Sequence, residues 1–260
     1  MKPAPNRAAR WLWLVAEILC IAVLAVVVLM IIGRLTDRGA VSREEQASTR
    51  AMQAVEPADS PETTPEPEKP PVIQPAIAAL QAQNPDAVGL LKFDADRSLY
   101  VCQGDDNYHY MYHQFDGTEN PAGMIFMDYR NTLLPRSDNL ILYGHNMRDG
   151  SRFGTLKRFT EAEYLLNHPI FTFADAYETV EYLPFAVFHT TVIEEDEAYF
   201  AFDRTDFADE AAFDAYIAEV KSRSVLDLPV EVNHGDKLLT LATCSSAHDR
   251  GRLVIVCKEK

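Results

Sequence analysis

The sequence predicts a mainly β protein, in which an eight-stranded barrel with a few peripheral helices follows one transmembrane helix. Three observations lead to this fold class. Eight short apolar runs between residues 90 and 259 have the length and the β-branched and aromatic content of strands. These runs do not alternate regularly with helical patterns, as they would in a parallel α/β sheet. An unbroken apolar segment near the N-terminus is long enough to cross a bilayer.

The N-terminal apolar segment, residues 11–33, is interpreted as an uncleaved membrane anchor. Its residues 11–32 contain one charged side chain, Glu17, and about 20 apolar residues suffice to span a bilayer. The core of a signal peptide is shorter, roughly 7–15 residues, and is followed by a small-residue cleavage site, which this segment lacks. Basic residues flank both ends, so we base the orientation on the short tail, residues 1–10. We expect a single-pass protein of the cell membrane with a cytoplasmic tail and an extracellular domain.

Residues 34–76 are predicted to form an extracellular, acidic, proline-rich linker. Residues 34–55 have mixed charge and are compatible with a loose helix. Residues 56–75 are rich in proline and glutamate, and proline fixes φ and removes a backbone donor, so this part is expected to be an extended spacer. The globular domain is expected to occupy residues 77–260.

Within the globular domain, eight runs and three helical patterns follow one another. A short helix should end at Asn84, because the residue before a proline disfavours the helical conformation. Thr160 and Glu163 form a capping-box pattern at the start of a second helix. The third helix lies within residues 206–224, and its apolar stripe should pack on a closed or nearly closed barrel: Phe213, Tyr216, Ile217 and Val220. The strands are expected within residues 90–93, 98–103, 123–129, 139–145, 170–173, 178–193, 237–244 and 252–259.

Charge and composition argue against several classes of partner. The formal net charge is −15, and such a surface repels phosphate backbones, so we expect no nucleic-acid partner. A zinc site needs about four ligands at consistent spacing, which His109, His113 and His248 do not supply. The acidic clusters at residues 105–107 and 194–197 are interpreted as solvated loop charge. We therefore expect no metal and no cofactor.

The four cysteines do not form a disulfide scaffold. Cys20 lies in the anchor, and the remaining three are an odd number, so they cannot all pair internally. Cys102 and Cys257 lie inside apolar runs and are interpreted as small buried hydrophobic residues. The only argument for a disulfide between them is that two cysteines remain once Cys244 is set aside. Cys244 differs from both because it ends its run.

Three residues form the candidate reactive set. Cys244 ends the run 237–244, and a strand end is a rigid platform with an accessible tip, although a lone cysteine there is more often structural. His145 follows a strand and adjoins Gly144, and histidine can exchange protons near neutral pH. Arg252 lies eight residues beyond the cysteine, where a fixed cation can stabilise the oxyanion of a tetrahedral centre.

The motifs around these residues resemble those of the sortases, membrane-anchored cysteine transpeptidases of Gram-positive bacteria. The matching features are YGHNM, DGSRFGTL, TLATC, the Cys-x7-Arg spacing and RLVIV. The closer resemblance is to class B, because NPDAVGLLKF, GMIFMDYRN, NLILYGHNM and the helix at about 206–222 occur in that class in the same order. The resemblance covers roughly residues 77–260.

The resemblance implies an eight-stranded sortase-type barrel with a defined chemistry. Cys244 would attack the carbonyl of a threonine in a C-terminal sorting motif of a surface protein and form a thioacyl intermediate. His145 would protonate the leaving amine, and Arg252 would hold the oxyanion or the substrate backbone. Thr243 would contribute to the substrate pocket. A peptidoglycan precursor or a pilin would supply the amine that resolves the intermediate.

Two positions depart from the class B pattern. Ser246 occupies the position two residues after the cysteine where the class commonly has an acidic residue, and Asp249 lies in the same loop at a different spacing. Ala242 replaces a serine of the usual TLSTC motif. The first departure concerns a carboxylate partner for His145, and the second concerns motif preference.

Two alternatives to transpeptidation stay open from the sequence alone. A membrane-tethered cysteine hydrolase would use the same three residues and resolve the intermediate with water. A non-catalytic wall-binding module on a stalk would need no thiol, so the joint occurrence of His145, Cys244 and Arg252 argues against it.

Overall fold

A computed structural model describes residues 7–55, 72–94, 97–245, 247 and 250–260 of the chain. The chain divides into two compact units, Met1–Ala40 and Val41–Lys260. Helix α1 (Arg7–Gln53) begins in the first unit and ends in the second. Side-chain positions are described from Ile18 onward.

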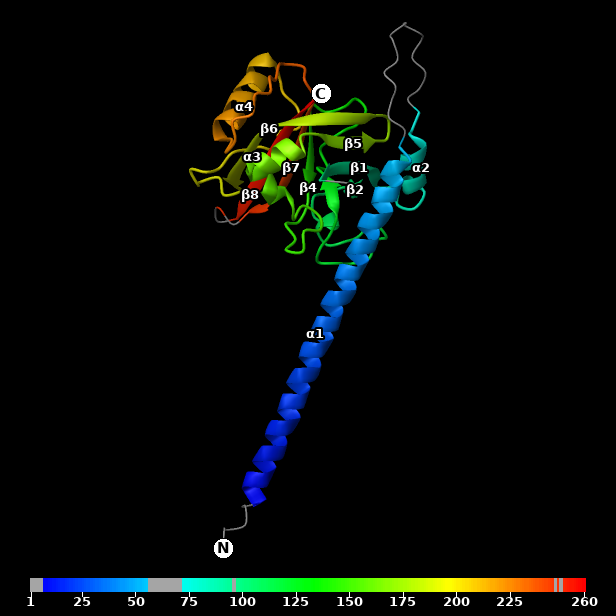
Figure 1. Ribbon diagram of the computed structural model, residues 1–260, viewed down its shortest axis with the longest axis vertical. Coiled ribbons are helices and arrows are strands. Elements are labelled where there is room, and N and C mark those ends of the chain that lie inside the picture. Colours follow the sequence, from blue (N-terminus) through cyan, green and yellow to red (C-terminus); the bar gives the residue numbers. More distant parts are fainter. Residues whose placement is uncertain (1–6, 56–71, 95–96, 246, 248–249) are drawn as a thin grey trace. The chain divides into compact units, whose positions relative to one another are not determined.

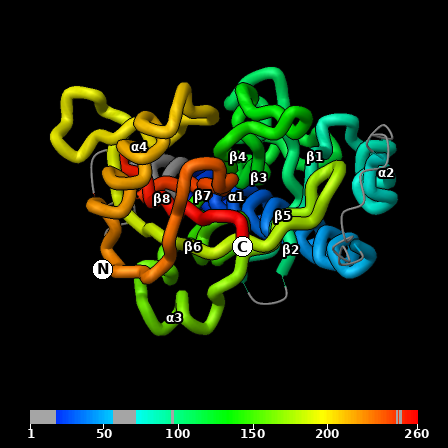
Figure 2. The backbone as a smooth tube through the Cα atoms, turned by 90° about the horizontal axis from the view of Figure 1, so that it is seen from above, coloured from blue at the N-terminus to red at the C-terminus, as the bar shows by residue number. Residues whose placement is uncertain are grey.

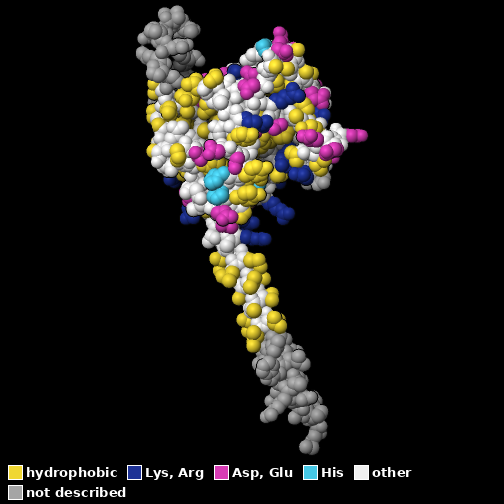
Figure 3. Space-filling view, turned by 180° about the vertical axis from the view of Figure 1, so that it is seen from behind, with side chains coloured by type: hydrophobic (Ala, Val, Ile, Leu, Met, Phe, Trp, Pro, Cys, Tyr) yellow, Lys and Arg dark blue, Asp and Glu magenta, His cyan; other side chains and the backbone are white. Residues whose placement is uncertain are grey.

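The first unit consists of the apolar part of α1. Its large apolar side chains are exposed, as Figure 3 shows for the described part of the helix; Leu24 and Leu29, for example, are each 67% exposed. The helix is long and apolar enough to cross a membrane, with a mean hydropathy of 3.0 over its most apolar 18-residue window. An exposed apolar helix of this length needs an apolar environment around it.

The second unit begins well before the predicted domain boundary at residue 77. Residues 41–53 belong to this unit and continue α1, whereas the sequence analysis placed them in the linker. Val41 is 3% exposed and Ser48 is 0% exposed. The sequence analysis did not anticipate this packing, because Ser48 and the two glutamates before it separate Val41 from the apolar residues Ala51 and Met52 on the same face. The rest of the predicted spacer, residues 56–71, lies outside the described residues.

Eight strands close into one barrel (Figure 1), which confirms the predicted fold class. Around the barrel the order is β1-β2-β3-β4-β7-β8-β6-β5, and β5 pairs with β1. The pairs β2/β3 and β4/β7 are parallel, and the other pairs are antiparallel. The strands are β1 (Ala87–Asp94), β2 (Arg97–Cys102), β3 (Ile125–Met127), β4 (Asn139–Tyr143), β5 (Phe171–Asp175), β6 (Thr179–Thr191), β7 (Leu238–Ser245) and β8 (Gly251–Glu259).

Alternating residues of β7 and β8 belong to two different apolar clusters. Leu239 and Leu241 join the interior core of the barrel, whereas Leu238 and Ala242 join a second cluster on the outer face. This is the period of two expected of a strand that is covered on both sides. Even-numbered residues of β7 therefore face outward.

Short helices surround the barrel, and α4 covers part of its outer face (Figure 2). The predicted stripe of α4 is buried against β6, β7 and β8, as expected, and Asp209 caps the helix by accepting a hydrogen bond from the Ala212 N–H at 2.8 Å. The helical elements of the second unit, besides the end of α1, are α2 (Pro75–Gln81), η1 (His109–Met111), η2 (Leu156–Thr160), α3 (Ala162–Asn167) and α4 (Glu210–Arg223).

Thr160, which the structure describes, does not cap helix α3 as the predicted capping box requires. Thr160 is the last residue of η2, and its hydroxyl donates to the Lys157 carbonyl at 2.8 Å. Glu161 is instead the N-cap of α3, without a side-chain cap hydrogen bond. The Thr160 hydroxyl therefore forms its hydrogen bond within the preceding 3₁₀ helix, η2, and does not cap α3.

Cys102 and Cys257 are both free and buried, as the sequence analysis expected of small hydrophobic residues. They belong to different apolar clusters, so they do not form the bridge that parity would allow. Burial raises the pKa of both thiols and so disfavours their thiolate forms.

Candidate active site

Cys244 and Arg252 are direct partners across two neighbouring strands. The antiparallel register of β7 and β8 pairs Cys244 with Arg252 and, one step along, Thr243 with Leu253. Side chains of directly opposed residues lie on the same face of a sheet. Leu253 belongs to the interior core, so Cys244 and Arg252 face outward. The thiol is exposed, and Arg252 is half-buried.

The segment that carries His145 runs along the other side of β7. The parallel register of β4 and β7 pairs Tyr143 with Ala242. Backbone contact continues beyond β4, because the Gly144 N–H donates to the Ala242 carbonyl at 3.3 Å. The Asn146 side-chain amide then donates to the Cys244 carbonyl at 2.8 Å. His145 thus follows β4, Cys244 lies on the neighbouring strand β7, and Arg252 lies on β8 at the other side of β7.

The hydrogen bond of the His145 ring determines which nitrogen carries a proton in the neutral form. Its Nε2 lies 2.8 Å from the Met111 carbonyl oxygen. A carbonyl oxygen only accepts, so Nε2 donates and Nδ1 holds the lone pair of the neutral ring. Nδ1 is therefore the nitrogen available to take up and release a proton.

Gly144 is required by close packing immediately before the histidine. A Cβ atom at this position would lie 2.9 Å from Cδ2 of Phe153 and closer still to Cδ1 of Ile125. Both neighbours belong to the interior core and are 0% exposed, so neither has room to move. The absence of a side chain lets the chain leave β4 across the end of the barrel core.

Thr243 does not share the surface of Cys244. It is 2% exposed, it alternates with Cys244 along β7, and its hydroxyl donates to the Gly144 carbonyl at 2.7 Å. This side chain joins β7 to the segment before His145. The contribution of Thr243 to the substrate pocket, which the resemblance implies, stays a prediction.

Comparison with known proteins identifies the family. A sequence model described as a sortase domain matches residues 95–260. The chain belongs to the sortase family. Sortase B of Listeria monocytogenes is 36% identical over 179 residues, which is 68% of this chain and 70% of the relative. Sortase B of Staphylococcus aureus is 31% identical over 189 residues, which is 72% of this chain and 75% of the relative.

The fold comparison agrees with the sequence comparison. The structure of a Staphylococcus aureus sortase B–substrate complex superposes with a TM-score of 0.72 at 26% identity and covers 87% of this chain and 98% of that one. Together these similarities support class B. Sortases are cysteine transpeptidases, so this chain is an enzyme of that kind.

An ionic network centred on one buried carboxylate, Asp128, contacts β4 of this sortase. Asp128 is 0% exposed and accepts hydrogen bonds at 2.8 Å from Nε and Nη2 of Arg130 and at 3.0 Å from the Tyr143 hydroxyl. Nη2 of Arg130 also donates to Asp203 at 2.8 Å, in the segment between β6 and α4. The sequence analysis missed these residues, because Asp and Arg two positions apart in a loop are indistinguishable from solvated charge until tertiary contacts are known.

The charge of Asp128 is maintained although the residue is buried. Burial by itself would raise the pKa of this carboxyl, but hydrogen bonds from the Arg130 side chain and backbone and from Asn107 outweigh that cost and lower it. The carboxylate therefore stays ionised over the neutral range and keeps the network together.

The other histidines do not form a metal site with their neighbours. The rings of His109 and His113 stack 4.1 Å apart; His109 is exposed and His113 is half-buried. In the part of the chain that the structure describes, no group of three or more His, Cys, Asp or Glu side chains is arranged to hold a metal ion. Ser246, His248 and Asp249, the loop residues considered in the sequence analysis, lie outside the described residues.

We expect Gly144→Ala to reduce peptide cleavage by about 100-fold, since the added methyl group must displace the segment before His145 and small displacements of catalytic groups are costly. Steady-state cleavage of a fluorogenic sorting peptide by the full chain in lipid nanodiscs measures the effect. Gly33→Ala is the matched control, because nothing lies within 4 Å of a Cβ at that position. Wild-type activity in Gly144→Ala would show that the core accommodates the methyl group without moving the histidine.

We expect Asp128→Asn to lower the free energy of unfolding by about 1–3 kcal/mol at pH 7. The pKa of Asp128 is lower in the folded chain than the usual unfolded value of about 3.9. Its contribution is thus present above that value and is lost as pH falls through the folded pKa. Denaturant unfolding should show that the difference in unfolding free energy between wild type and Asp128→Asn becomes smaller from pH 7 to pH 3. Asp214→Asn, at an exposed position, is the control and should unfold with nearly the wild-type free energy. A difference independent of pH would contradict the ionic explanation.

Proposed function

We propose that this sortase cleaves a C-terminal sorting motif of surface proteins after threonine and transfers the acyl group to an amine. The observation that carries the proposal is the pairing of Cys244 with Arg252 on the outer face, with the His145 segment along the other edge of β7. An exposed thiol, a proton-exchanging imidazole and a fixed cation are the groups that acyl transfer requires.

In the acylation step the Cys244 thiolate attacks the threonine carbonyl carbon and forms the C–S bond. The negative charge that develops on the carbonyl oxygen is stabilised by the Arg252 guanidinium. Collapse of this tetrahedral centre breaks the peptide C–N bond, and the protonated His145 ring donates its proton to the leaving amine. The products are a thioester on Cys244, a free amine and a neutral imidazole.

In the second step an incoming amine attacks the thioester carbonyl. The neutral His145 accepts a proton from that amine, and the lone pair identified on Nδ1 is suited to this. The C–S bond breaks as the new amide forms, which restores the thiolate and the protonated ring. Two moderate barriers replace one large barrier for direct exchange of a peptide bond.

The partners of the reaction follow from the family. The Staphylococcus aureus relative has been solved as a substrate complex, which supports a bound peptide substrate here: a surface protein with a C-terminal sorting signal. The amine would come from a peptidoglycan precursor or a pilin. Residues 11–33 would anchor the enzyme in the cell membrane, with residues 1–10 in the cytoplasm and the catalytic unit outside. The exposed apolar helix supports this arrangement.

Hydrolysis is a second candidate outcome of the same chemistry. Cys244 is exposed, so water has access to a thioester formed on it. A library of five-residue peptides containing threonine, offered with candidate amines and read by mass spectrometry, separates the two. Amide products support transfer, whereas a free acid with every amine offered establishes a hydrolase.

We expect Cys244→Ala to reduce peptide cleavage to background while far-UV circular dichroism stays unchanged, because the thiol is exposed and contributes little packing. As an internal control, iodoacetamide should modify Cys244 in the wild type and spare Cys102 and Cys257, whose burial raises their pKa. Peptide mapping of the alkylated chain gives this pattern. Undiminished cleavage by Cys244→Ala would remove the thiol from the mechanism.

We expect Arg252→Lys to lower kcat by about 100-fold or more, because an ammonium does not reproduce the rigid, multiply donating guanidinium. The loss should fall on kcat rather than on KM if the cation acts mainly on the developing oxyanion. Steady-state kinetics with the best library peptide measures the division. An increase in KM at unchanged kcat would instead assign Arg252 to substrate binding.

A further inference from the structure

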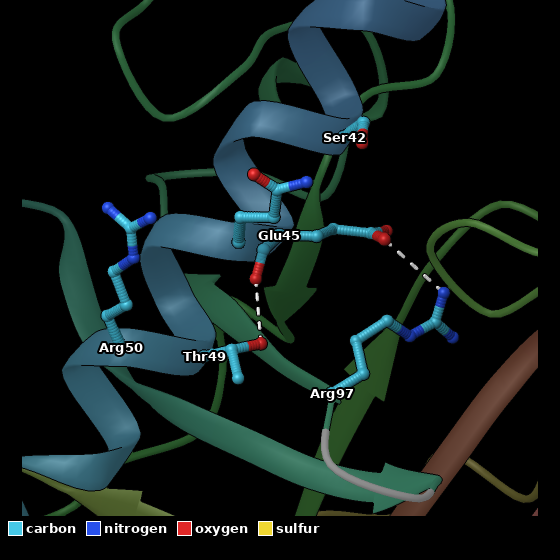
Figure 4. A pocket seen from close by; sticks show the side chains of 6 residues that line it. Ser42, Glu45, Thr49, Arg50 and Arg97 are labelled. Carbon is cyan, nitrogen blue, oxygen red and sulfur yellow. Dashed lines mark hydrogen bonds and ion pairs between the residues drawn. The ribbon is translucent and has the colours of Figure 1, made fainter.

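Polar side chains of the last turns of α1 contact the barrel alongside Ala51 and Met52, which pack against an apolar cluster of the second unit. The Ser48 hydroxyl donates to the Ser98 carbonyl, and the Thr49 hydroxyl accepts from the Ser98 N–H at 3.0 Å. Figure 4 shows Glu45 on this helix pointing toward Arg97 of β2, and both residues line an open pocket of about 350 Å³. Polar groups in specific contacts of this kind fix one docked position.

Glu44 links two segments that are distant in sequence. Its Oε1 accepts from Nη1 of Arg152 at 2.5 Å, and its Oε2 accepts from the Phe115 N–H at 3.3 Å. Arg152 is 1% exposed, and its Nε and Nη2 have no hydrogen-bond partner among the described residues. The Glu44 carboxylate therefore supplies the counter-charge to a buried guanidinium.

Both segments held by Glu44 also hold His145. On one side, the Phe153 N–H donates to the His145 carbonyl at 3.1 Å, and Asn146 and Arg152 form a β-bridge. On the other side, the Met111 carbonyl, four residues before Phe115, accepts from the imidazole at 2.8 Å. The carboxylate thus ties together the chain segment that carries the ring and the chain segment that orients it.

Glu45 strengthens the first of these attachments. Its Oε1 accepts from the Arg152 N–H at 2.9 Å, and its Oε2 lies 3.3 Å from Nη1 of Arg97, the pair joined by a dashed line in Figure 4. Nη1 of Arg97 also donates to the Gly150 carbonyl at 2.7 Å. Arg152 has a φ of +52°, which is uncommon for a residue other than glycine and persists where surrounding contacts enforce it.

We propose that Glu44 and Glu45 are positioning residues for His145, and that the docked end of α1 is thereby part of this enzyme's active-site support. The inference rests on the proposed role of His145. It implies that the catalytic unit extends to Val41, and that the carboxylates act on turnover through the histidine rather than through the thiol or the substrate.

The test compares Glu44→Gln with two controls in the full chain reconstituted in lipid nanodiscs. Glu219→Gln removes the same charge from a carboxylate paired with Arg223 at 2.7 Å on α4, away from the histidine. Ser48→Ala removes a docking contact that reaches β2 and neither segment around His145. We expect kcat for peptide cleavage to fall about tenfold in Glu44→Gln with KM within twofold of wild type, and both controls to stay within twofold in kcat.

Two further measurements separate positioning from general loss of stability. Hydrogen exchange read by mass spectrometry should accelerate in residues 109–115 and 144–154 of Glu44→Gln and not in β7. The rate at which iodoacetamide alkylates Cys244 should stay unchanged. Unaltered exchange in both segments, or acceleration throughout the second unit together with a matching loss of kcat, would overturn the proposal.

Glu45→Gln keeps the test decisive if Glu44→Gln does not fold. In Glu45→Gln, hydrogen exchange should accelerate in residues 144–154 and not in residues 109–115, since Glu45 contacts the first segment and Glu44 contacts Phe115 in the second. Unchanged exchange there would refute the inference. If the wild type cleaves no sorting peptide, the proposed function fails, whereas the exchange measurements still decide whether the carboxylates hold the segments around His145.

Discussion

The backbone register of β7 between β4 and β8 is the constraint on which the active site depends. The hydrogen bonds between β7 and β8 pair Cys244 with Arg252. Those between β4 and β7 place the segment that follows β4 next to the end of β7. Because side chains alternate along a strand, a slip by one residue would turn Cys244 into the interior core and Thr243 outward. The chemistry of this sortase is therefore specified first by main-chain pairing and only then by side-chain identity.

Packing on both faces makes that register hard to change. Leu239 and Leu241 are buried inside the barrel, while Leu238 and Ala242 are buried under the outer cluster that includes α4. A strand fixed on two sides has little freedom to move its last residues. Asn146 and Thr243 extend this rigidity beyond the end of β4, since each side chain bonds to a carbonyl of the other segment.

The parts of the fold that sequence reasoning anticipated are those with periodic apolar patterns. All eight strands and the stripe of α4 were predicted from such patterns, and the three residues of the proposed active site were singled out by motif and spacing. The parts it missed depend on buried polar groups: Ser48 in the docked end of α1, and Asp128, whose partner Arg130 is itself exposed. Hydropathy scores such residues as exposed, and only the fold shows the partners that offset their burial.

The positions of the cysteines bear on how this enzyme would respond to an oxidant. Cys244 faces outward on β7, whereas Cys257 is enclosed in the interior core and Cys102 lies in a third cluster. Both buried sulfurs belong to residues that are 0% exposed, so neither is accessible to the exposed thiol while the fold is intact. An oxidant would therefore leave Cys244 to form a sulfenic acid or a mixed disulfide with a small thiol, both of which exogenous reductants can reverse, and the folded unit acquires no internal covalent cross-link.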